Sequence, residues 1–182
     1  MRNPLSRVSM LWLLLLILGL AAACAKEQKG VTLRMRSGSA RSTGMWALVI
    51  GVGRYTDPAI RSIPFCVQDV RDLGEVLRAG GYQVVELSDQ ASEEPLKPTK
   101  NNILVQAKRL LTEDERIRPE DIVVIYFSGH GYAGESGAYL VASDTYESQV
   151  EKTGVKVADL RGLVQACRAT RAGCQHPCHA FN

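Results

Sequence analysis

The segment Asp121-Ile-Val-Val-Ile-Tyr-Phe-Ser128 carries the strongest strand signal of the chain and decides its fold. A continuous run of β-branched and aromatic residues is typical of a strand that is buried on both faces. Trp46-Ala-Leu-Val-Ile-Gly-Val52 is a second run of this kind, and residues 82–87 form another predicted strand. A short segment, Tyr139-Leu-Val-Ala142, follows the main strand. We therefore expect a mostly parallel sheet whose faces are covered by helices.

The stretches between these strands have helical periodicity. The first predicted helix ends at Gly80-Gly81, and Thr99 is a suitable N-cap for the second. The inward positions of these two helices and of a third one are apolar: Cys66, Val70, Leu73 and Leu77; Ile103, Leu104, Ala107, Leu110 and Leu111; Val157, Leu160, Leu163, Val164 and Cys167. Because strands alternate with helices, we expect the α/β fold class.

The composition is that of one globular domain of ordinary size. The chain has 182 residues, of which 46% are apolar and 23% charged, and this excludes a large multidomain protein and a mostly disordered chain. The formal net charge of +3 is too small to indicate nucleic acid as a partner. The five cysteines are too few for a disulfide scaffold, and an odd number cannot all be paired.

The N-terminal residues resemble an export signal. Residues 1–25 begin with a basic stretch, followed by an apolar run that is too short to span a bilayer and ends in small residues. We interpret them as a signal peptide. Leu20-Ala-Ala-Ala-Cys24 resembles a bacterial lipobox, although Ala21 stands where that box usually has leucine. Cys24 is therefore a candidate for lipidation, and ordinary cleavage after Ala23 is the alternative.

Residues 26–44 are rich in Lys, Arg, Ser and Gly and lack apolar periodicity, so we interpret them as a flexible linker. Removal of residues 1–23 would take away two arginines and no acid, which leaves the mature chain nearly neutral. These features predict an exported protein. It is either a periplasmic or membrane-anchored lipoprotein, with the lipid on Cys24 as its membrane contact, or a secreted protein.

Functional sites in parallel sheets lie beyond the carboxyl ends of the strands, and two glycine-rich stretches follow predicted strands here. His130, in Ser128-Gly-His-Gly131, follows the strongest strand, and we expect its imidazole to be exposed at the mouth of the sheet. Histidine titrates near neutrality, which suits proton transfer; a loop histidine in a tight turn is the alternative. Gly51-Val-Gly-Arg-Tyr55 lacks the third glycine of a dinucleotide-binding loop, and we interpret it as a turn.

Four blocks, in order and at suitable spacing over about residues 46–169, resemble one known family. They are Trp46-Ala-Leu-Val-Ile-Gly-Val-Gly-Arg-Tyr55, Phe65-Cys-Val-Gln-Asp-Val70, Tyr126-Phe-Ser-Gly-His-Gly131 and Tyr139-Leu-Val-Ala-Ser-Asp144. They look like a caspase-type cysteine peptidase domain, in particular that of metacaspases and their bacterial relatives. The resemblance implies a three-layer α/β/α caspase-like fold with a mostly parallel central sheet over residues 45–170. It also implies cleavage of peptide bonds by a histidine–cysteine dyad through a thioester.

The resemblance implies roles for individual residues as well. His130 matches the family's catalytic histidine, and the backbone N–H of Gly131 matches one donor of its oxyanion hole. Cys66, Asp69 and Ser128 match positions that line the pocket for the substrate's P1 residue in metacaspases. Their spacing puts Cys66 and Asp69 on one helix face, and an acid in that pocket would select Arg or Lys at P1. The alternative for Asp69 is a solvated acid on a helix surface.

The family's catalytic cysteine follows a fourth apolar strand, and no apolar strand precedes a cysteine in the last residues of this chain. We therefore expect the fold to be incomplete at its C-terminus, and we interpret residues 171–182 as an atypical tail of the kind that a frameshift or premature stop produces. Cys178 is the candidate nucleophile, because its separation from His130 is near that of the family and His179 follows it. However, His176 stands where the family's motif has its aspartate.

Two other interpretations concern the same region. Gln165-Ala-Cys167-Arg-Ala resembles a caspase signature, but Cys167 lies on a helical stripe and fits a buried core thiol better. A metal-binding tail is the other interpretation, although its spacing is more compressed than in most zinc sites. It would use four soft ligands within six residues: Cys174, His176, Cys178 and His179.

We therefore expect a cysteine endopeptidase of the caspase or metacaspase type, which acts on protein or peptide substrates with Arg or Lys at P1. The alternative is a catalytically inactive, truncated domain that acts as a binding module or has no function. No cofactor and no nucleic-acid partner are expected. Calcium activates some metacaspases, but this sequence has no assembled acidic cluster that indicates a calcium site.

Overall fold

The computed structural model describes residues 42–175 and 178–180, and from residue 174 onward only their backbone. The predicted signal peptide, Cys24 and most of the predicted linker thus lie outside the described residues. Within the described ranges, no helix is long and apolar enough to cross a membrane.

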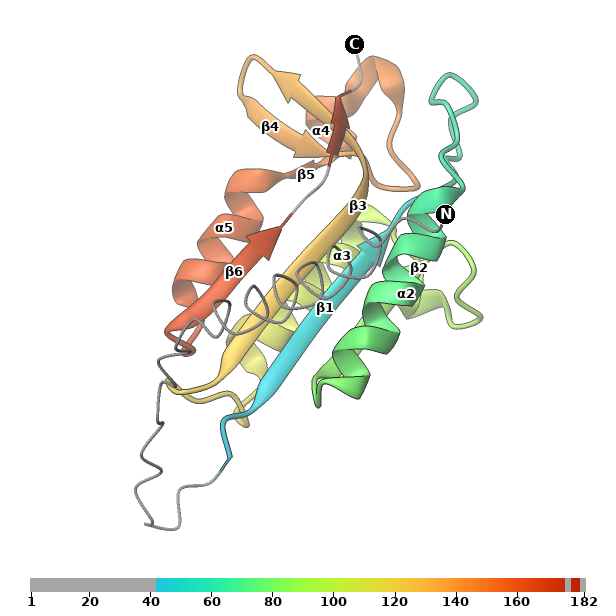
Figure 1. Ribbon diagram of the computed structural model, residues 1–182. Coiled ribbons are helices and arrows are strands. Elements are labelled where there is room, and N and C mark those ends of the chain that lie inside the picture. Colours follow the sequence, from blue (N-terminus) through green and yellow to red (C-terminus); the bar gives the residue numbers. More distant parts are fainter. Residues whose placement is uncertain (1–41, 176–177, 181–182) are drawn as a thin grey trace, which may run out of the picture. The chain divides into compact units, whose positions relative to one another are not determined.

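Strands and helices alternate along this part of the chain (Figure 1). The strands are β1 (Met45–Gly51), β2 (Gln83–Ser88), β3 (Ile122–Gly134), β4 (Gly137–Leu140), β5 (Val155–Lys156), β6 (Arg171–Gln175) and β7 (Cys178–Ala180). The helices are α2 (Phe65–Ala79), α3 (Lys100–Lys108), α4 (Val150–Thr153) and α5 (Val157–Ala166). Short 3-10 turns span Glu94–Leu96 and Glu147–Gln149, and a π-helical turn, Arg109–Glu113, continues α3.

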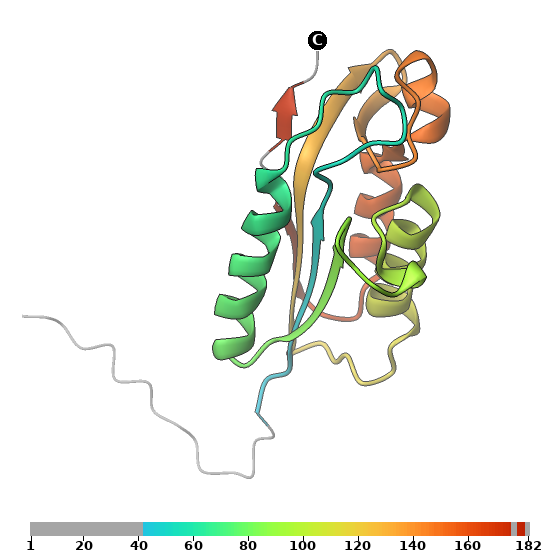
Figure 2. The same cartoon turned by 90° about the vertical axis from the view of Figure 1, so that its right-hand side faces the viewer.

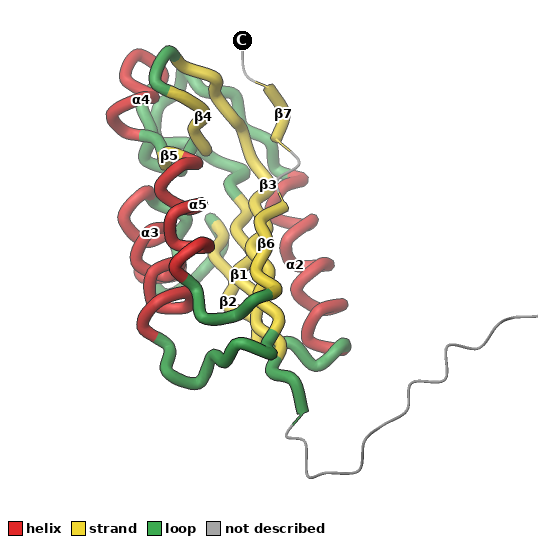
Figure 3. The backbone as a smooth tube through the Cα atoms, turned by 90° about the vertical axis from the view of Figure 1, so that its left-hand side faces the viewer, coloured by secondary structure: helices red, strands yellow, loops and turns green. Residues whose placement is uncertain are grey.

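The sheet has the order β2-β1-β3-β4-β5, and β6 and β7 also pair with β3. β1 lies between β2 and β3 and is parallel to both. β6 and β7 run parallel to β3 at successive points along it, whereas β4 and β5 are antiparallel additions (Figure 3). The prediction of a mostly parallel α/β sheet is therefore confirmed.

Helices cover the two faces of the sheet unequally. Figure 2 shows α2 on one face and α3 and α5 on the other, so the three-layer arrangement is confirmed. The main core lies on the α3 and α5 side, where Phe127 and Ile125 of β3 pack with Ile103 of α3 and Leu160 of α5. All four side chains are almost fully buried, and each such burial stabilises the fold by about 1.5–3 kcal/mol.

The predicted burial of β3 on both faces is wrong for one face. Val123, Ile125 and Phe127 are buried, but the alternate residues of the strand, such as Val124 and Tyr126, are only half-buried. The reason is that α2 is the one helix against that face in the described part of the chain (Figure 2).

The predicted ends of the first two helices agree with the structure. Gly81 follows α2 with φ +88°, a left-handed conformation that glycine adopts at little cost. The side-chain oxygen of Thr99 accepts a hydrogen bond from the backbone N–H of Asn102 and so caps α3 as expected. Close packing of α2 on β1 requires glycine at position 51, because a Cβ there would lie 2.6 Å from the Val70 side chain of α2.

Two expectations about the strands are wrong. β3 does not end at Ser128 but continues to Gly134, because its second half forms a hairpin with β4. The polar stretch Arg171–Gln175, for which no strand is expected from hydrophobicity, forms β6. The hydrogen bonds that the edge of β3 offers explain this strand, since pairing with an existing edge needs no apolar run.

Asp121 fastens the amino end of the sheet. Its carboxylate accepts hydrogen bonds from the backbone N–H of Gly44 at 2.7 Å, the backbone N–H of Arg118 at 3.1 Å and the indole N–H of Trp46 at 3.1 Å. Burial acts to raise the pKa of Asp121, but these three hydrogen bonds outweigh it, so the pKa lies below its ordinary value.

We expect the Asp121→Asn substitution to lower the free energy of unfolding at pH 7 by about 1–3 kcal/mol, because an amide cannot accept all three hydrogen bonds. A carboxyl with a lowered pKa stabilises the fold above its ordinary pKa and loses this effect as the pH falls through the lowered value. The difference between the variant and the wild type should therefore shrink in strong acid.

Urea unfolding at several pH values measures this difference. Glu120→Gln removes an exposed carboxylate one residue away and serves as the matched control. An Asp121→Asn effect that is no larger than that of the control would contradict the assignment.

Candidate active site

The residues around His130 lie just beyond the parallel part of the sheet. β1 ends at Gly51, which is paired with Ser128 of β3, so Gly129, His130 and Gly131 continue past the end of β1. This position agrees with the expectation for sites in parallel sheets. The expected exposure of His130 is wrong, since only 8% of the residue is accessible. The physical reason is that the segment after β1 folds over the imidazole.

Three contacts orient His130. Its Nε2 lies 2.7 Å from the backbone carbonyl oxygen of Arg61, and its backbone N–H donates to the hydroxyl of Tyr55 at 3.1 Å. The Tyr55 ring lies beside the imidazole, with 5.3 Å between ring centroids. Tyr55 is held in turn, because its hydroxyl donates to the carbonyl of Val52. Since a carbonyl oxygen only accepts, the contact with Arg61 requires the proton on Nε2 and leaves the lone pair of the neutral ring on Nδ1.

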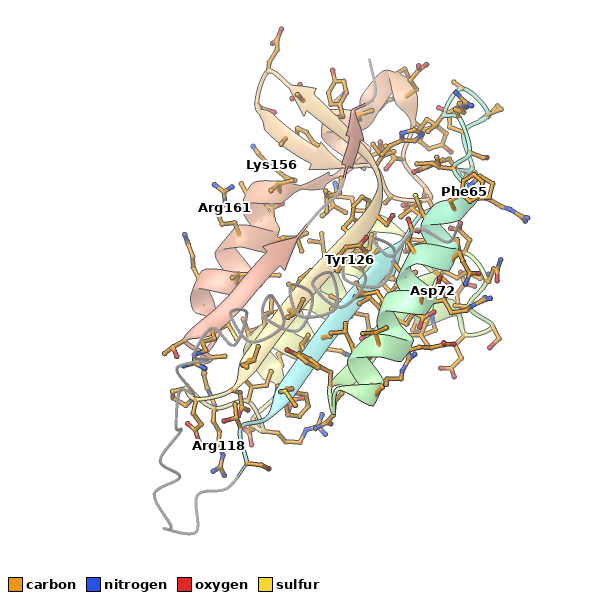
Figure 4. The ribbon with its side chains drawn as sticks, in the orientation of Figure 1. Phe65, Asp72, Arg118, Tyr126, Lys156 and Arg161 are labelled. Atoms are coloured by element: carbon orange, nitrogen blue, oxygen red, sulfur yellow. The ribbon has the colours of Figure 1, made fainter. Side chains whose placement is uncertain are left out.

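The structure brings Cys66, Asp69 and Ser128 together, as the sequence predicts. The Ser128 hydroxyl donates to Asp69 Oδ2 at 3.2 Å, which joins β3 to α2. Asp69 is exposed, but it is not merely solvated, because it accepts this hydrogen bond. Tyr126, labelled in Figure 4, lies two residues before Ser128 on the same face of β3, and the charge of Asp69 on α2 acts on its phenol. The exposed Asp69 carboxylate thus lies near a buried hydroxyl, a buried thiol and a half-buried phenol, those of Ser128, Cys66 and Tyr126.

Burial and nearby charge make this cluster a poor place for anions. Burial raises the pKa of the Cys66 thiol, and the charges of Asp69 and Asp89 raise it further, while the hydrogen bond with Ser128 acts in the opposite direction. The pKa of Tyr126 is also raised, first by burial and then by the charge of Asp69. Burial, the larger cause, disfavours charge of either sign, whereas the negative charge of Asp69 favours a positively charged partner.

The candidate cysteines lie at very different places. Cys178 begins β7, and its backbone is paired with Gly129, the residue before His130. Neighbouring strands lie about 4.8 Å apart, so the backbones of β7 and β3 are adjacent at this point. Cys167 follows α5 instead of lying within it, and it is half-buried against the core instead of fully buried. Gly131, the predicted oxyanion donor, is paired with Leu140 of β4 and with Ala180 of β7.

The metal-binding interpretation of the tail concerns side chains outside the described part of the chain. Among the described residues, the structure brings no group of three or more His, Cys, Asp or Glu side chains together that would hold a metal ion.

Sequence reasoning assigns no role to Tyr55, Arg61 or Asp89. Arg61 acts through its backbone carbonyl, which every residue has, so its identity carries no signal. Tyr55 belongs to a quoted block, but its contact with His130 joins positions 75 residues apart. Asp89 lies just after the strand predicted over residues 82–87, where sites in parallel sheets are expected, and this location is the one signal that could have identified it.

We expect Cys66 to resist iodoacetamide in the folded chain near neutral pH and to react after unfolding in urea. Only 2% of the residue is accessible, and its raised pKa keeps the thiol protonated, whereas the thiolate is the reactive form. Peptide-level mass spectrometry measures the modification of each cysteine separately. Rapid modification of Cys66 in the native protein would contradict this description of its surroundings.

Comparisons with known proteins agree with this geometry. The chain is 33% identical over 109 residues to Metacaspase-1 of Scheffersomyces stipitis, and this match covers 58% of the chain and 25% of that protein. The chain therefore spans about a quarter of the length of this curated relative. A family model described as "Caspase domain" matches residues 45–177, which is more than half of the chain and includes all of β6. The chain belongs to the caspase domain family of peptidases.

Proposed function

We propose that this chain cleaves peptide bonds as a cysteine endopeptidase, with His130 as the general base and Cys178 as the nucleophile. The observation behind the proposal is the backbone register of β7, which pairs Cys178 with Gly129 and His179 with His130, so that the backbone of the candidate cysteine runs alongside the segment that carries the histidine. The contact of Nε2 with the Arg61 carbonyl supports it, since this contact leaves Nδ1 as the basic nitrogen.

In the proposed reaction, Nδ1 of His130 takes the proton from the Cys178 thiol. The sulfur then forms a bond to the substrate carbonyl carbon, and the negative charge on the carbonyl oxygen is stabilised by the N–H of Gly131. The C–N bond breaks as the imidazolium returns the proton to the leaving amine. Water next hydrolyses the thioester, again with His130 as the base, which releases the acid product and restores the thiol.

The proposal includes a preference for Arg or Lys at P1. Asp69 supplies a negative charge on the face of α2 next to Ser128, and after burial this charge is one of the causes that raise the pKa values of Cys66 and Tyr126. A substrate cation would pair with the Asp69 carboxylate.

We also propose that the protein is exported. This part of the proposal is based on residues 1–25 alone, which would act either as a plain signal peptide or as a lipoprotein signal with the lipid on Cys24.

We expect the full chain to hydrolyse fluorogenic reporter peptides with Arg or Lys at P1, and both His130→Ala and Cys178→Ala to lower kcat roughly 10⁴-fold or more. Cys167→Ala is the matched cysteine control and should retain the activity. Activity that survives Cys178→Ala would remove this cysteine from the mechanism. A folded chain without hydrolysis would favour the catalytically inactive alternative, a binding module.

We expect Asp69→Asn to lower kcat/KM for substrates with Arg or Lys at P1 by roughly 10- to 100-fold, with little change for a neutral P1 residue, because it removes the charge that pairs with the substrate. Asp72→Asn is the matched control: it removes an exposed carboxylate one turn further along α2 (Figure 4). Equal losses for basic and neutral substrates would show that Asp69 supports the fold instead of selecting P1.

A further inference from the structure

Asp89 is a carboxylate at the carboxyl edge of the sheet to which the proposed mechanism gives no role. It directly follows β2, and its Oδ2 accepts hydrogen bonds from the backbone N–H of Gly53 at 2.7 Å and of Arg54 at 2.8 Å. Glycine eases this close approach, since a Cβ on Gly53 would lie 3.1 Å from that oxygen, which is closer than an ordinary van der Waals contact. One carboxylate oxygen therefore holds the chain at the point where it leaves β1.

The segment that Asp89 holds, residues 52–64, is also the segment that surrounds His130. The carbonyl of Gly53 accepts a hydrogen bond from the N–H of Ile63 at 2.8 Å, which closes the segment on itself. Arg61, two residues before Ile63, supplies the carbonyl that faces Nε2 of His130. Tyr55, two residues after Gly53, supplies the hydroxyl and the ring that contact the same histidine. All of these contacts with His130 thus come from the anchored segment.

The second carboxylate oxygen of Asp89 lowers the stability of the fold, which indicates that Asp89 has a role other than stabilising the folded state. Oδ1 is buried and has no hydrogen-bond partner among the described residues. Burial also raises the pKa of Asp89, against the two backbone N–H groups and the charge of Arg54, which lower it. An unsatisfied buried oxygen costs free energy, whereas an ionised acceptor strengthens the two hydrogen bonds to the loop. Asp121 differs, because both of its oxygens accept hydrogen bonds.

We propose that Asp89 is a positioning residue for His130: it holds the segment 52–64 so that the Arg61 carbonyl sets the tautomer of the imidazole, while Tyr55 holds the backbone of the histidine with its hydroxyl and packs its ring beside the imidazole. The inference rests on the proposed function, in which His130 is the general base. Asp89 itself makes no contact with the substrate in this proposal and acts only through the loop.

The imidazole tautomer tests the proposal without any need for activity. Long-range proton–nitrogen NMR spectra of the full 182-residue chain report which ring nitrogen carries the proton, and His130→Ala identifies the His130 signals. We expect the Nε2–H tautomer in the wild type and a mixture of tautomers in Asp89→Ala. Asp121→Ala is the matched control, because it also removes a carboxylate bound to backbone N–H groups, but at the opposite end of β1. It should leave the His130 signals unchanged.

Kinetics supply a second readout. Asp89→Ala should lower kcat by about 10- to 100-fold with little change in KM, as expected when a reacting group is misplaced. Asp89→Asn should recover most of this loss, because its amide oxygen accepts from the same two N–H groups. If Asp89→Ala does not fold, Asp89→Glu replaces it, since the longer side chain displaces the carboxylate and should change the tautomer in the same way.

The outcomes separate this inference from the proposed function. An unchanged His130 spectrum in Asp89→Ala or Asp89→Glu overturns the inference, whether or not the chain cleaves peptides. An Asn variant as impaired as the Ala variant also overturns it, because the hydrogen bonds would then not be the cause. A wild-type chain that cleaves no reporter peptide contradicts the proposed function, while the tautomer measurement still decides the role of Asp89.

Discussion

The parallel pairing of β1 with β3, in the register that sets Gly51 against Ser128, is the constraint on which the rest of the structure depends. This register ends β1 two residues before His130, so that the segment leaving β1 must cross over the histidine. It also directs Ser128 toward α2, which packs closely on β1 because Gly51 has no side chain. A shift of one residue would turn Ser128 away from Asp69, because side chains alternate between the faces of a strand.

The two sides of His130 are built from different parts of the chain. On one side, α2 and β3 contribute the cluster of Cys66, Asp69, Tyr126 and Ser128. Burial and the negative charge of Asp69 raise the pKa values of Cys66 and Tyr126 there. On the other side, the segment after β1 supplies backbone and hydroxyl contacts that orient the imidazole. The proposed selection of P1 and the proposed orientation of the base would therefore use contacts from different parts of the chain, although the charge of Asp89, which holds the segment after β1, also acts on Cys66.

The edge of β3 explains why hydrophobicity fails as a guide near the C-terminus. Arg171–Gln175 is polar, yet it forms β6, because an unpaired strand edge supplies hydrogen bonds to any extended backbone that lies along it. The same edge pairs with β7, which brings the backbone of Cys178 beside Gly129. The family match, which runs to residue 177, agrees with a domain that continues past the last apolar helix.

Periodicity and glycine placement in the sequence were enough to determine the α/β class, the parallel central strands and the ends of α2 and α3. These features follow from local patterns, namely apolar runs, caps and helical spacing. The convergence of Cys66, Asp69 and Ser128 was expected from the resemblance to metacaspases, since helical spacing by itself places only Cys66 and Asp69 on one face. Only the tertiary structure decided that His130 is buried, that the Arg61 carbonyl faces its Nε2, and that Asp89 anchors the loop above it. The contacts with the Arg61 carbonyl, the Tyr55 hydroxyl and Asp89 join positions 36 to 75 residues apart, and each of them uses a backbone atom, which every residue has and which therefore leaves no mark on the sequence.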